Sequence, residues 1–212
     1  MAATPLLLAL DQGTSSSRAV VFDSRGNLIA SASAPLEIHY PADGWVEQDP
    51  MAIWRSQHQA MASLEGQLTA EQRQAVACCG ITNQRETTVL WQRSDGAPCG
   101  PALVWQDGRT ADLCQTWKNQ GLEADWRRRT GLLLDPYFSA SKIHWLLQHE
   151  DAASAAAARH DLCFGTVESW LLWQLSGGKT HGSDMSNASR TLLMDLKQRQ
   201  WVGDFCQEVG LP

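Results

Sequence analysis

Charged residues are scarce in this sequence of 212 residues, at 19%, and acidic residues outnumber basic ones to give a formal net charge of −6. A chain with this balance lacks the positive surface through which proteins generally bind nucleic acids or anionic membranes. We therefore expect no nucleic-acid partner. An anionic substrate would have to be neutralised locally, by main-chain N–H groups, a helix N-terminus or Mg²⁺.

Long apolar runs and paired cysteines are also missing. The run Leu6–Leu10 is too short to span a membrane, and neither a basic segment nor a cleavage site accompanies it. The six cysteines form no C-x-x-C pair and no cluster with histidine at zinc-site spacing. We therefore expect a cytoplasmic protein without a membrane span, whose thiols are reduced and mostly buried.

The apolar fraction of 43% is enough for a substantial core, and its pattern predicts an α/β fold. Three apolar segments separated by short polar turns predict an opening β-meander rather than a βαβ unit, and Asp49-Pro50 is typical of a helix start. A single domain with helices over a sheet is the simplest organisation. The predicted strands are 6–11, 18–23, 28–35, 75–82, 87–92 and 102–105, and the predicted helices begin at 50, 110, 139, 152, 166 and 204.

The polar loop between the first two predicted strands could bind phosphate. Asp11 ends a strand, where a carboxylate can help to hold Mg²⁺, and Gly13 lets the main chain approach a bulky anion. Thr14, Ser15 and Ser16 add hydroxyl and N–H donors, and Arg18 adds a planar cation. The loop matches neither G-x-x-x-x-G-K-[ST] nor G-x-G-x-x-G, and taken alone it is equally compatible with a polar hairpin tip.

A second group of polar residues could hold a neutral polyol. Arg85 offers N–H donors and Glu86 offers acceptors, which together could orient adjacent hydroxyls. Neighbours on a regular strand point to opposite faces, so the main chain must be irregular here if both touch one substrate. Trp105 could cover polyol carbons and Tyr137 could bind one oxygen. Residue types alone favour a solvated ion pair, a core tryptophan and a helix-entry tyrosine.

Taken together, six segments resemble the glycerol-kinase branch of the FGGY carbohydrate-kinase family. They follow the family's order from near residue 8 to residue 191, and the pair GITNQRET and GWVEQDP is far more specific than the phosphate loop. The segments are ALDQGTSSSRAVVFD, YPADGWVEQDP, GITNQRETTVLW, TGLLLDPYFSASKI, FGTVESWLLWQL and SNASRT.

The resemblance implies an actin-like (ribonuclease-H-like) α/β fold in which a mixed sheet is covered by helices, and an ATP-dependent phosphorylation of glycerol to sn-glycerol 3-phosphate. It implies that Asp11 organises Mg²⁺. It implies further that glycerol is held by Arg85, Glu86, Trp105 and Tyr137, and that the ATP phosphates face Gly13, Thr14, Ser15, Ser16 and Arg18. It also implies a homo-oligomer for the full-length enzyme.

The family's catalytic aspartate lies in a D-x-x-A-x-x-G-type segment that does not occur before Pro212. The resemblance therefore implies that residues 1–212 are an incomplete N-terminal glycerol- and phosphate-binding domain, with the second domain absent and little activity in isolation. A kinase for another polyol or sugar of the same family is an alternative, as is a non-catalytic truncated remnant. An actin-like chaperone ATPase would share the phosphate loop but would not require the four polyol residues together.

Overall fold

The computed structural model describes residues 4–212, and the chain forms two compact units. The first unit holds the residues up to Ile38 together with Met51–Gln84. The second unit holds His39–Pro50 together with Arg85–Pro212. The chain therefore passes from the first unit to the second between Gln84 and Arg85, inside one of the motifs that the sequence singles out.

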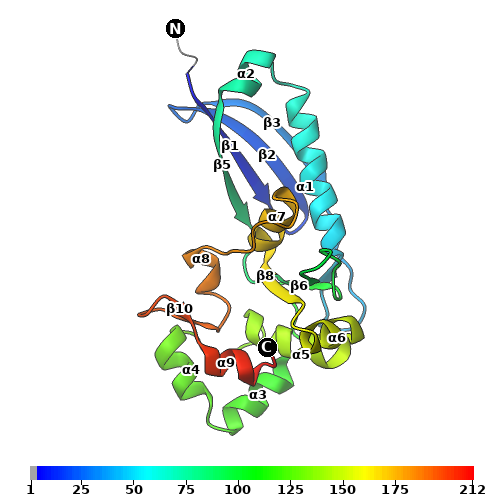
Figure 1. Ribbon diagram of the computed structural model, residues 1–212, viewed down its shortest axis with the longest axis vertical. Coiled ribbons are helices and arrows are strands. Elements are labelled where there is room, and N and C mark those ends of the chain that lie inside the picture. The colour runs from blue at the N-terminus through cyan, green and yellow to red at the C-terminus, as the bar shows by residue number, and fades with distance from the viewer. Residues whose placement is uncertain (1–3) are drawn as a thin grey trace. The chain divides into compact units, whose positions relative to one another are not determined.

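The first unit is built on a four-stranded mixed sheet in the order β3-β2-β1-β5 (Figure 1). Its first three strands form an antiparallel meander, and β5 runs parallel to β1. The predicted meander is confirmed, and its third strand has the predicted bounds. The strands are β1 (Leu6–Gln12), β2 (Ser16–Asp23), β3 (Leu28–Pro35) and β5 (Val76–Asn83).

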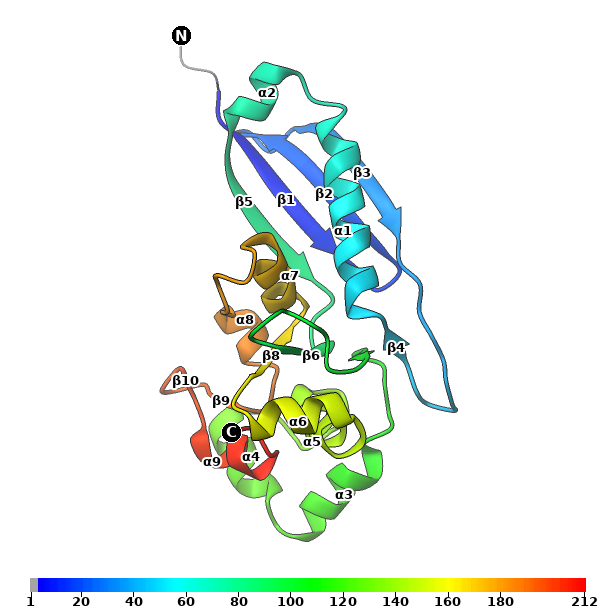
Figure 2. The same cartoon turned by 45° about the vertical axis from the view of Figure 1, so that its right-hand side comes forward.

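Helix α1 (Pro50–Glu65) begins at the predicted proline and lies along the sheet (Figure 2). Its Ala60 and Leu64 pack in a core with Leu10, Ala19 and other buried residues of the strands. The short helix α2 (Ala70–Ala75) was not predicted, although Thr69 and Gln72 form a reciprocal capping box at its start.

The second unit contains a four-stranded sheet in the order β4-β7-β6-β8, with antiparallel neighbours. The predicted strand at 102–105 is shorter than expected, because the chain leaves the sheet at Val104. The pattern did not predict β4 or β8. The strands are β4 (Glu47–Gln48), β6 (Thr88–Gln92), β7 (Ala102–Leu103) and β8 (Leu162–Thr166).

Helices make up most of the rest of the second unit. The helices at 110, 139, 152, 166 and 204 are confirmed to within one residue at their starts, whereas α4, α8 and the β9–β10 hairpin were not predicted. The elements are α3 (Ala111–Asn119), α4 (Glu123–Thr130), α5 (Ser139–His149), α6 (Asp151–Ala158), α7 (Val167–Leu175), α8 (Met185–Ala188), α9 (Gly203–Glu208), β9 (Met194–Asp195) and β10 (Gln200–Trp201).

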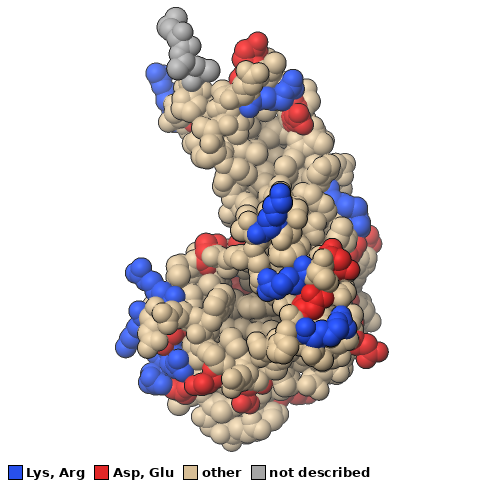
Figure 3. All heavy atoms as spheres, in the orientation of Figure 1, with Lys and Arg blue, Asp and Glu red and all other residues tan. Residues whose placement is uncertain are grey.

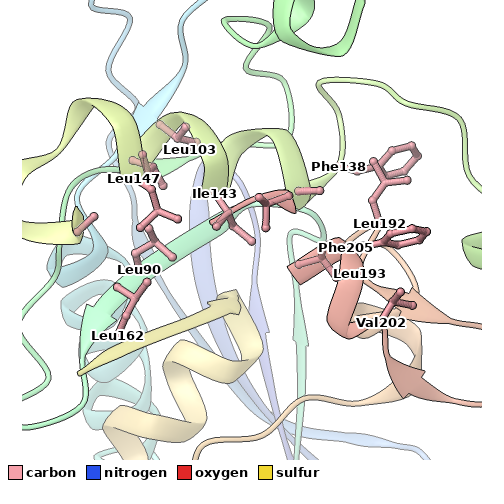
Figure 4. Packing of buried hydrophobic residues seen from close by; sticks show 14 of the residues in the cluster. Leu90, Leu103, Phe138, Ile143, Leu147, Leu162, Leu192, Leu193, Val202 and Phe205 are labelled. Carbon is pink, nitrogen blue, oxygen red and sulfur yellow. The ribbon is translucent and has the colours of Figure 1, made fainter. Parts of the chain in front are cut away.

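One apolar core joins the sheet of the second unit to its helices (Figure 4). Leu90 of β6 and Leu162 of β8 belong to it, as do Ile143 of α5 and Phe205 of α9. Because α5 contributes a continuous buried face, its position is fixed by packing along its whole length. Helix α5 is therefore a rigid support for the loops that precede it and follow β7.

Surface features agree only partly with the sequence-based expectations. Acidic and basic side chains are intermixed on the face shown in Figure 3, and uncharged atoms cover most of that face.

All six cysteines are free, and Cys99, Cys114 and Cys163 are buried as predicted. The prediction is wrong for Cys78 and Cys79, which are exposed because β5 pairs with β1 only and its flanks are uncovered. No helix within residues 4–212 is both long and apolar enough to cross a lipid bilayer.

Two glycines provide a matched test of the backbone at helix ends. Gly121 follows α3 with a φ of 81°, whereas Gly203 begins α9 with an ordinary φ, and neither has a neighbouring atom where a Cβ would lie. We expect Gly121→Ala to lower the free energy of unfolding by about 1 kcal/mol, because a Cβ is strained in the left-handed region. Gly203→Ala should leave it unchanged or raise it, as measured by urea denaturation. Equal losses for the two variants would contradict the assigned backbone at Gly121.

Candidate functional site

The phosphate loop predicted from the sequence is a tight connection between β1 and β2. The Gly13 N–H donates to the Ser16 carbonyl oxygen at 2.9 Å, and a Cβ on Gly13 would lie 3.1 Å from that same oxygen. The Ser15 carbonyl accepts from the Leu36 N–H at 3.0 Å. The turn therefore favours glycine at position 13 because the main chain approaches itself closely there, whether or not a ligand is bound.

Asp11 and Arg18 are directly paired partners on β1 and β2, and their side chains form an ion pair at 2.7 Å. The Arg18 side chain is 60% exposed and that of Asp11 is 33% exposed. An ion pair this open to water contributes little to stability, so either side chain can exchange its partner for a ligand at small cost. Asp11, which was predicted to bind the metal, and Arg18, which was predicted to face phosphate, therefore lie opposite each other on neighbouring strands.

Buried amide and hydroxyl groups hold this loop from behind. Gln12 is fully buried, and its Nε2 donates to the Gly13 carbonyl at 2.7 Å while its Oε1 accepts from Gln84 Nε2 at 3.0 Å. The Ser17 and Ser56 hydroxyls lie 2.7 Å apart. These supports come from three separate segments of the first unit. Gln12, Ser17 and Gln84 lie in two of the segments that carry the resemblance, whereas Ser56 does not, and only the fold reveals that the four residues support the loop.

The Arg85–Glu86 step is irregular, as the sequence analysis requires for a shared substrate. Glu86 has a φ of 64°, in the left-handed region that a non-glycine residue rarely adopts, and residues 85 and 86 form a turn between β5 and β6. The Glu86 side chain is buried, whereas Arg85 is exposed. Strain of this kind persists only where the surrounding structure enforces it, and it is concentrated at functional sites.

Arg190 enforces the position of the buried Glu86 carboxylate. Arg190 Nε donates to Glu86 Oε1 at 2.6 Å, and its guanidinium carbon lies 5.0 Å from the Phe138 ring centroid and 5.9 Å from that of Tyr137. A charge-assisted hydrogen bond to a buried carboxylate is among the stronger polar interactions in proteins. Arg190 was not among the predicted site residues, although it lies in the SNASRT segment that carried part of the resemblance.

The two predicted aromatic residues meet beside this ion pair. The Trp105 and Tyr137 rings pack edge to face with centroids 5.8 Å apart, and both side chains are half-buried. The Trp105 N–H donates to the Thr87 hydroxyl at 3.2 Å. Glu86, Tyr137 and Trp105 are therefore linked through Arg190 into one cluster in the second unit. Arg85 adjoins this cluster through the chain, with its side chain directed to solvent.

The loop after Trp105 is fixed by a buried ion cluster. The Arg109 side chain is fully buried, bonds to both oxygens of Asp107, and forms a further ion pair with Glu47 at 2.8 Å. Its guanidinium lies 3.9 Å from the Trp45 ring centroid and 4.5 Å from that of Trp145. The GWVEQD segment is thus tied to the WQDGRT segment, which sets the path of the main chain just beyond Trp105.

Lys142 of α5 is a fully buried lysine beneath the aromatic pair. Its Nζ donates to the Val104 carbonyl at 2.8 Å and to the Tyr137 carbonyl at 3.3 Å. Burial lowers the pKa of Lys142 from 10.5 to about 7, and the positive charge of Arg109 lowers it further. The negative charges of Asp107, Glu86 and Asp135 act in the opposite direction, because they favour the protonated amine. The protonated amine has three N–H groups and the neutral amine has two, so both can donate to the Val104 and Tyr137 carbonyls.

The lowered pKa of Lys142 predicts a dependence of stability on pH. Between pH 7 and 10.5 the unfolded chain binds more protons at this residue than the folded chain, so its contribution to stability rises with pH. Between pH 7 and 9, wild type should gain about 2 kcal/mol in unfolding free energy relative to Lys142→Met, because the slope rises to ~1.4 kcal/mol per pH unit only above the folded pKa. Urea denaturation across this interval measures the difference. Parallel curves for the two proteins would show that Lys142 does not titrate there.

Comparisons with known proteins identify the family to which the chain belongs. The family model described as FGGY family of carbohydrate kinases, N-terminal domain, matches residues 6–212. The chain is 53% identical over 206 residues to glycerol kinase of Citrifermentans bemidjiense and 50% identical over 207 residues to that of Ralstonia nicotianae. In each case the match covers 97% of this chain and 41% of the relative, so the chain spans well under half the length of these relatives.

Solved structures give the same assignment at the level of the fold. The crystal structure of Plasmodium falciparum glycerol kinase with ADP superposes with a TM-score of 0.89 at 30% identity, covering 98% of this chain and 42% of that chain. The xylulose kinase of Rhodospirillum rubrum superposes with a TM-score of 0.85 at 23% identity, covering 98% and 41%, and this likeness shows the fold alone. The predicted actin-like α/β fold is confirmed. This chain belongs to the FGGY family of carbohydrate kinases, with the N-terminal domain of that family over residues 6–212.

Proposed function

We propose that this chain is the N-terminal glycerol- and phosphate-binding part of a kinase that transfers a phosphoryl group from ATP to glycerol, forming sn-glycerol 3-phosphate. The observation that carries the proposal is the cluster of Glu86, Arg190, Tyr137 and Trp105 beside the strained turn at Arg85–Glu86. Support also comes from the relatives of 50% to 53% identity, which are themselves glycerol kinases.

The cluster has the chemistry that a small polyol requires. The Glu86 carboxylate accepts hydrogen bonds from hydroxyl groups, and the neighbouring Arg85 guanidinium donates to hydroxyl oxygens. The Trp105 ring gives the carbon chain an apolar wall, and the Tyr137 hydroxyl serves as a further polar contact. Glu86 and Arg85 would fix which hydroxyl is presented for reaction, and holding reactants in place supplies much of the rate enhancement in phosphoryl transfer.

ATP would be bound through its phosphates by the loop of the first unit. Thr14, Ser15 and Ser16 would supply main-chain or hydroxyl donors, Gly13 would let the main chain approach the phosphates, and Arg18 would supply positive charge at an exposed position. No three acidic, histidine or cysteine side chains gather as a metal site within residues 4–212. The single Asp11 carboxylate nevertheless fits Mg²⁺, which takes few protein ligands when phosphate oxygens and water complete its coordination. Bound Mg²⁺ would neutralise charge on the phosphates.

Variants of the polyol cluster test the proposal in the full-length protein. Glu86→Gln keeps the shape but removes the charge, and Arg85→Ala removes the donors, so each should raise the KM for glycerol roughly tenfold or more and also lower kcat. Arg127→Ala, which changes another exposed arginine of the second unit, is the matched control. A coupled ADP-release assay gives the constants.

The same assay with a panel of polyols, pentoses and gluconate tests the substrate. Glycerol should give the highest kcat/KM. A pentose that outcompetes glycerol would overturn the substrate assignment and support a different sugar kinase of the same family. Unchanged glycerol kinetics in both Arg85→Ala and Glu86→Gln would remove these residues from the site.

A further inference from the structure

A buried lysine connects the two main-chain segments that carry the aromatic residues of the proposed glycerol site. Lys142 Nζ bonds to the carbonyl of Val104, the residue just before Trp105, and to the carbonyl of Tyr137 itself. These two segments are remote in sequence and belong to different loops, one following β7 and one preceding α5. One amine therefore spans the base of the Trp105–Tyr137 pair.

Both carbonyls lie where regular secondary structure does not satisfy them. The chain leaves β7 at Leu103, so Val104 and Trp105 stand in a turn, and Tyr137 stands in the turn before α5. The Val104 carbonyl also accepts from the Asp107 main-chain N–H at 2.9 Å, so an apolar side chain at position 142 would remove one of its two donors. The same change would remove the Lys142 donor from the Tyr137 carbonyl, and a buried carbonyl that loses a donor is destabilised. The bonds therefore hold the two turns to α5 at a fixed separation.

The helix that supplies this lysine is packed against the core. Residues on both sides of Lys142 in α5 are buried, including Ser141 and Ile143, and the Ser141 hydroxyl bonds to that of Thr110 at 2.8 Å. The Nζ thus projects from a packed support, and burial restricts its rotamers. A flexible surface lysine could not set the distance between two loops, whereas this one can.

We infer that Lys142 is a positioning residue for polyol recognition, which sets the spacing and orientation of Trp105 and Tyr137 by binding the main chain at both. This inference rests on the proposed function, because it concerns the same glycerol site. Lys142 acts on the walls of that site within the second unit, whereas the phosphate loop belongs to the first unit. Its loss should weaken glycerol binding while leaving ATP binding intact.

Steady-state kinetics of the full-length protein separate this role from a merely structural one. Lys142→Met has nearly the volume of lysine, is one atom shorter and removes both hydrogen bonds. It should raise the KM for glycerol roughly tenfold while the KM for ATP changes less than about twofold. Lys142→Arg retains N–H donors and should recover part of the loss. Leu146→Ala removes a buried side chain one turn further along α5, so it destabilises the same helix without touching either carbonyl.

The comparison with Leu146→Ala decides the outcome. If Leu146→Ala retains the glycerol KM of wild type and Lys142→Met does not, the positioning role is supported. If Lys142→Met retains that KM, or if both variants raise the KM values for glycerol and ATP alike, the inference is wrong. Wild-type protein that fails to phosphorylate glycerol would instead overturn the proposed function, which is a separate result.

NMR of the wild-type protein gives a second test that does not depend on a folded variant. With carbon-13-labelled lysine, the Lys142 signal should shift when glycerol saturates the protein, because the walls of the site are bonded to its amine. The signals of Lys179 and Lys197, which are exposed, serve as internal controls. An unmoved Lys142 signal at saturating glycerol would contradict the inference.

Discussion

The candidate site depends on one buried carboxylate held in a strained backbone. Glu86 occupies the left-handed region at the point where the chain passes between its two units, and its side chain is withdrawn from water. Desolvating a carboxylate is expensive unless a cation or several donors compensate it, and Arg190 supplies that compensation. The ion pair in turn places the Arg190 guanidinium beside the Tyr137 and Phe138 rings. Under the proposed function, the carboxylate would bind hydroxyls of the substrate and the neighbouring rings would form an apolar wall.

Buried cations also hold the chain near the aromatic residues of the second unit. Arg109 joins Asp107 to Glu47, and Lys142 joins the turns at Val104 and Tyr137. In each case a buried cation ties a loop or turn to another part of the chain, because Arg109 joins the loop at Asp107 to strand β4 and Lys142 joins two turns. Such loops would otherwise vary in conformation, and recognition of a molecule as small as glycerol tolerates little displacement.

Local signals in the sequence predicted much of the fold. The Asp49-Pro50 start of α1, the Ser24–Asn27 turn of the meander and the apolar face of α5 are each encoded within a few residues. Strand β4 has two residues and is defined by pairing with β7 and by an antiparallel bridge from Glu47 to His39, so no local pattern predicts it. Helix α4 is strongly polar and lacks a capping side chain, and its position is set instead by the buried Trp126.

The predicted site residues were identified by motif, whereas their supports were not. Arg190 lies 104 residues from Glu86 and Lys142 lies 38 from Val104, so these roles become visible only when the fold brings the partners together. The most direct test of the account is a crystal structure of the full-length protein with glycerol. The account predicts hydroxyls bonded to Arg85 and Glu86 and carbon atoms against Trp105. Glycerol bound away from all three residues would contradict it.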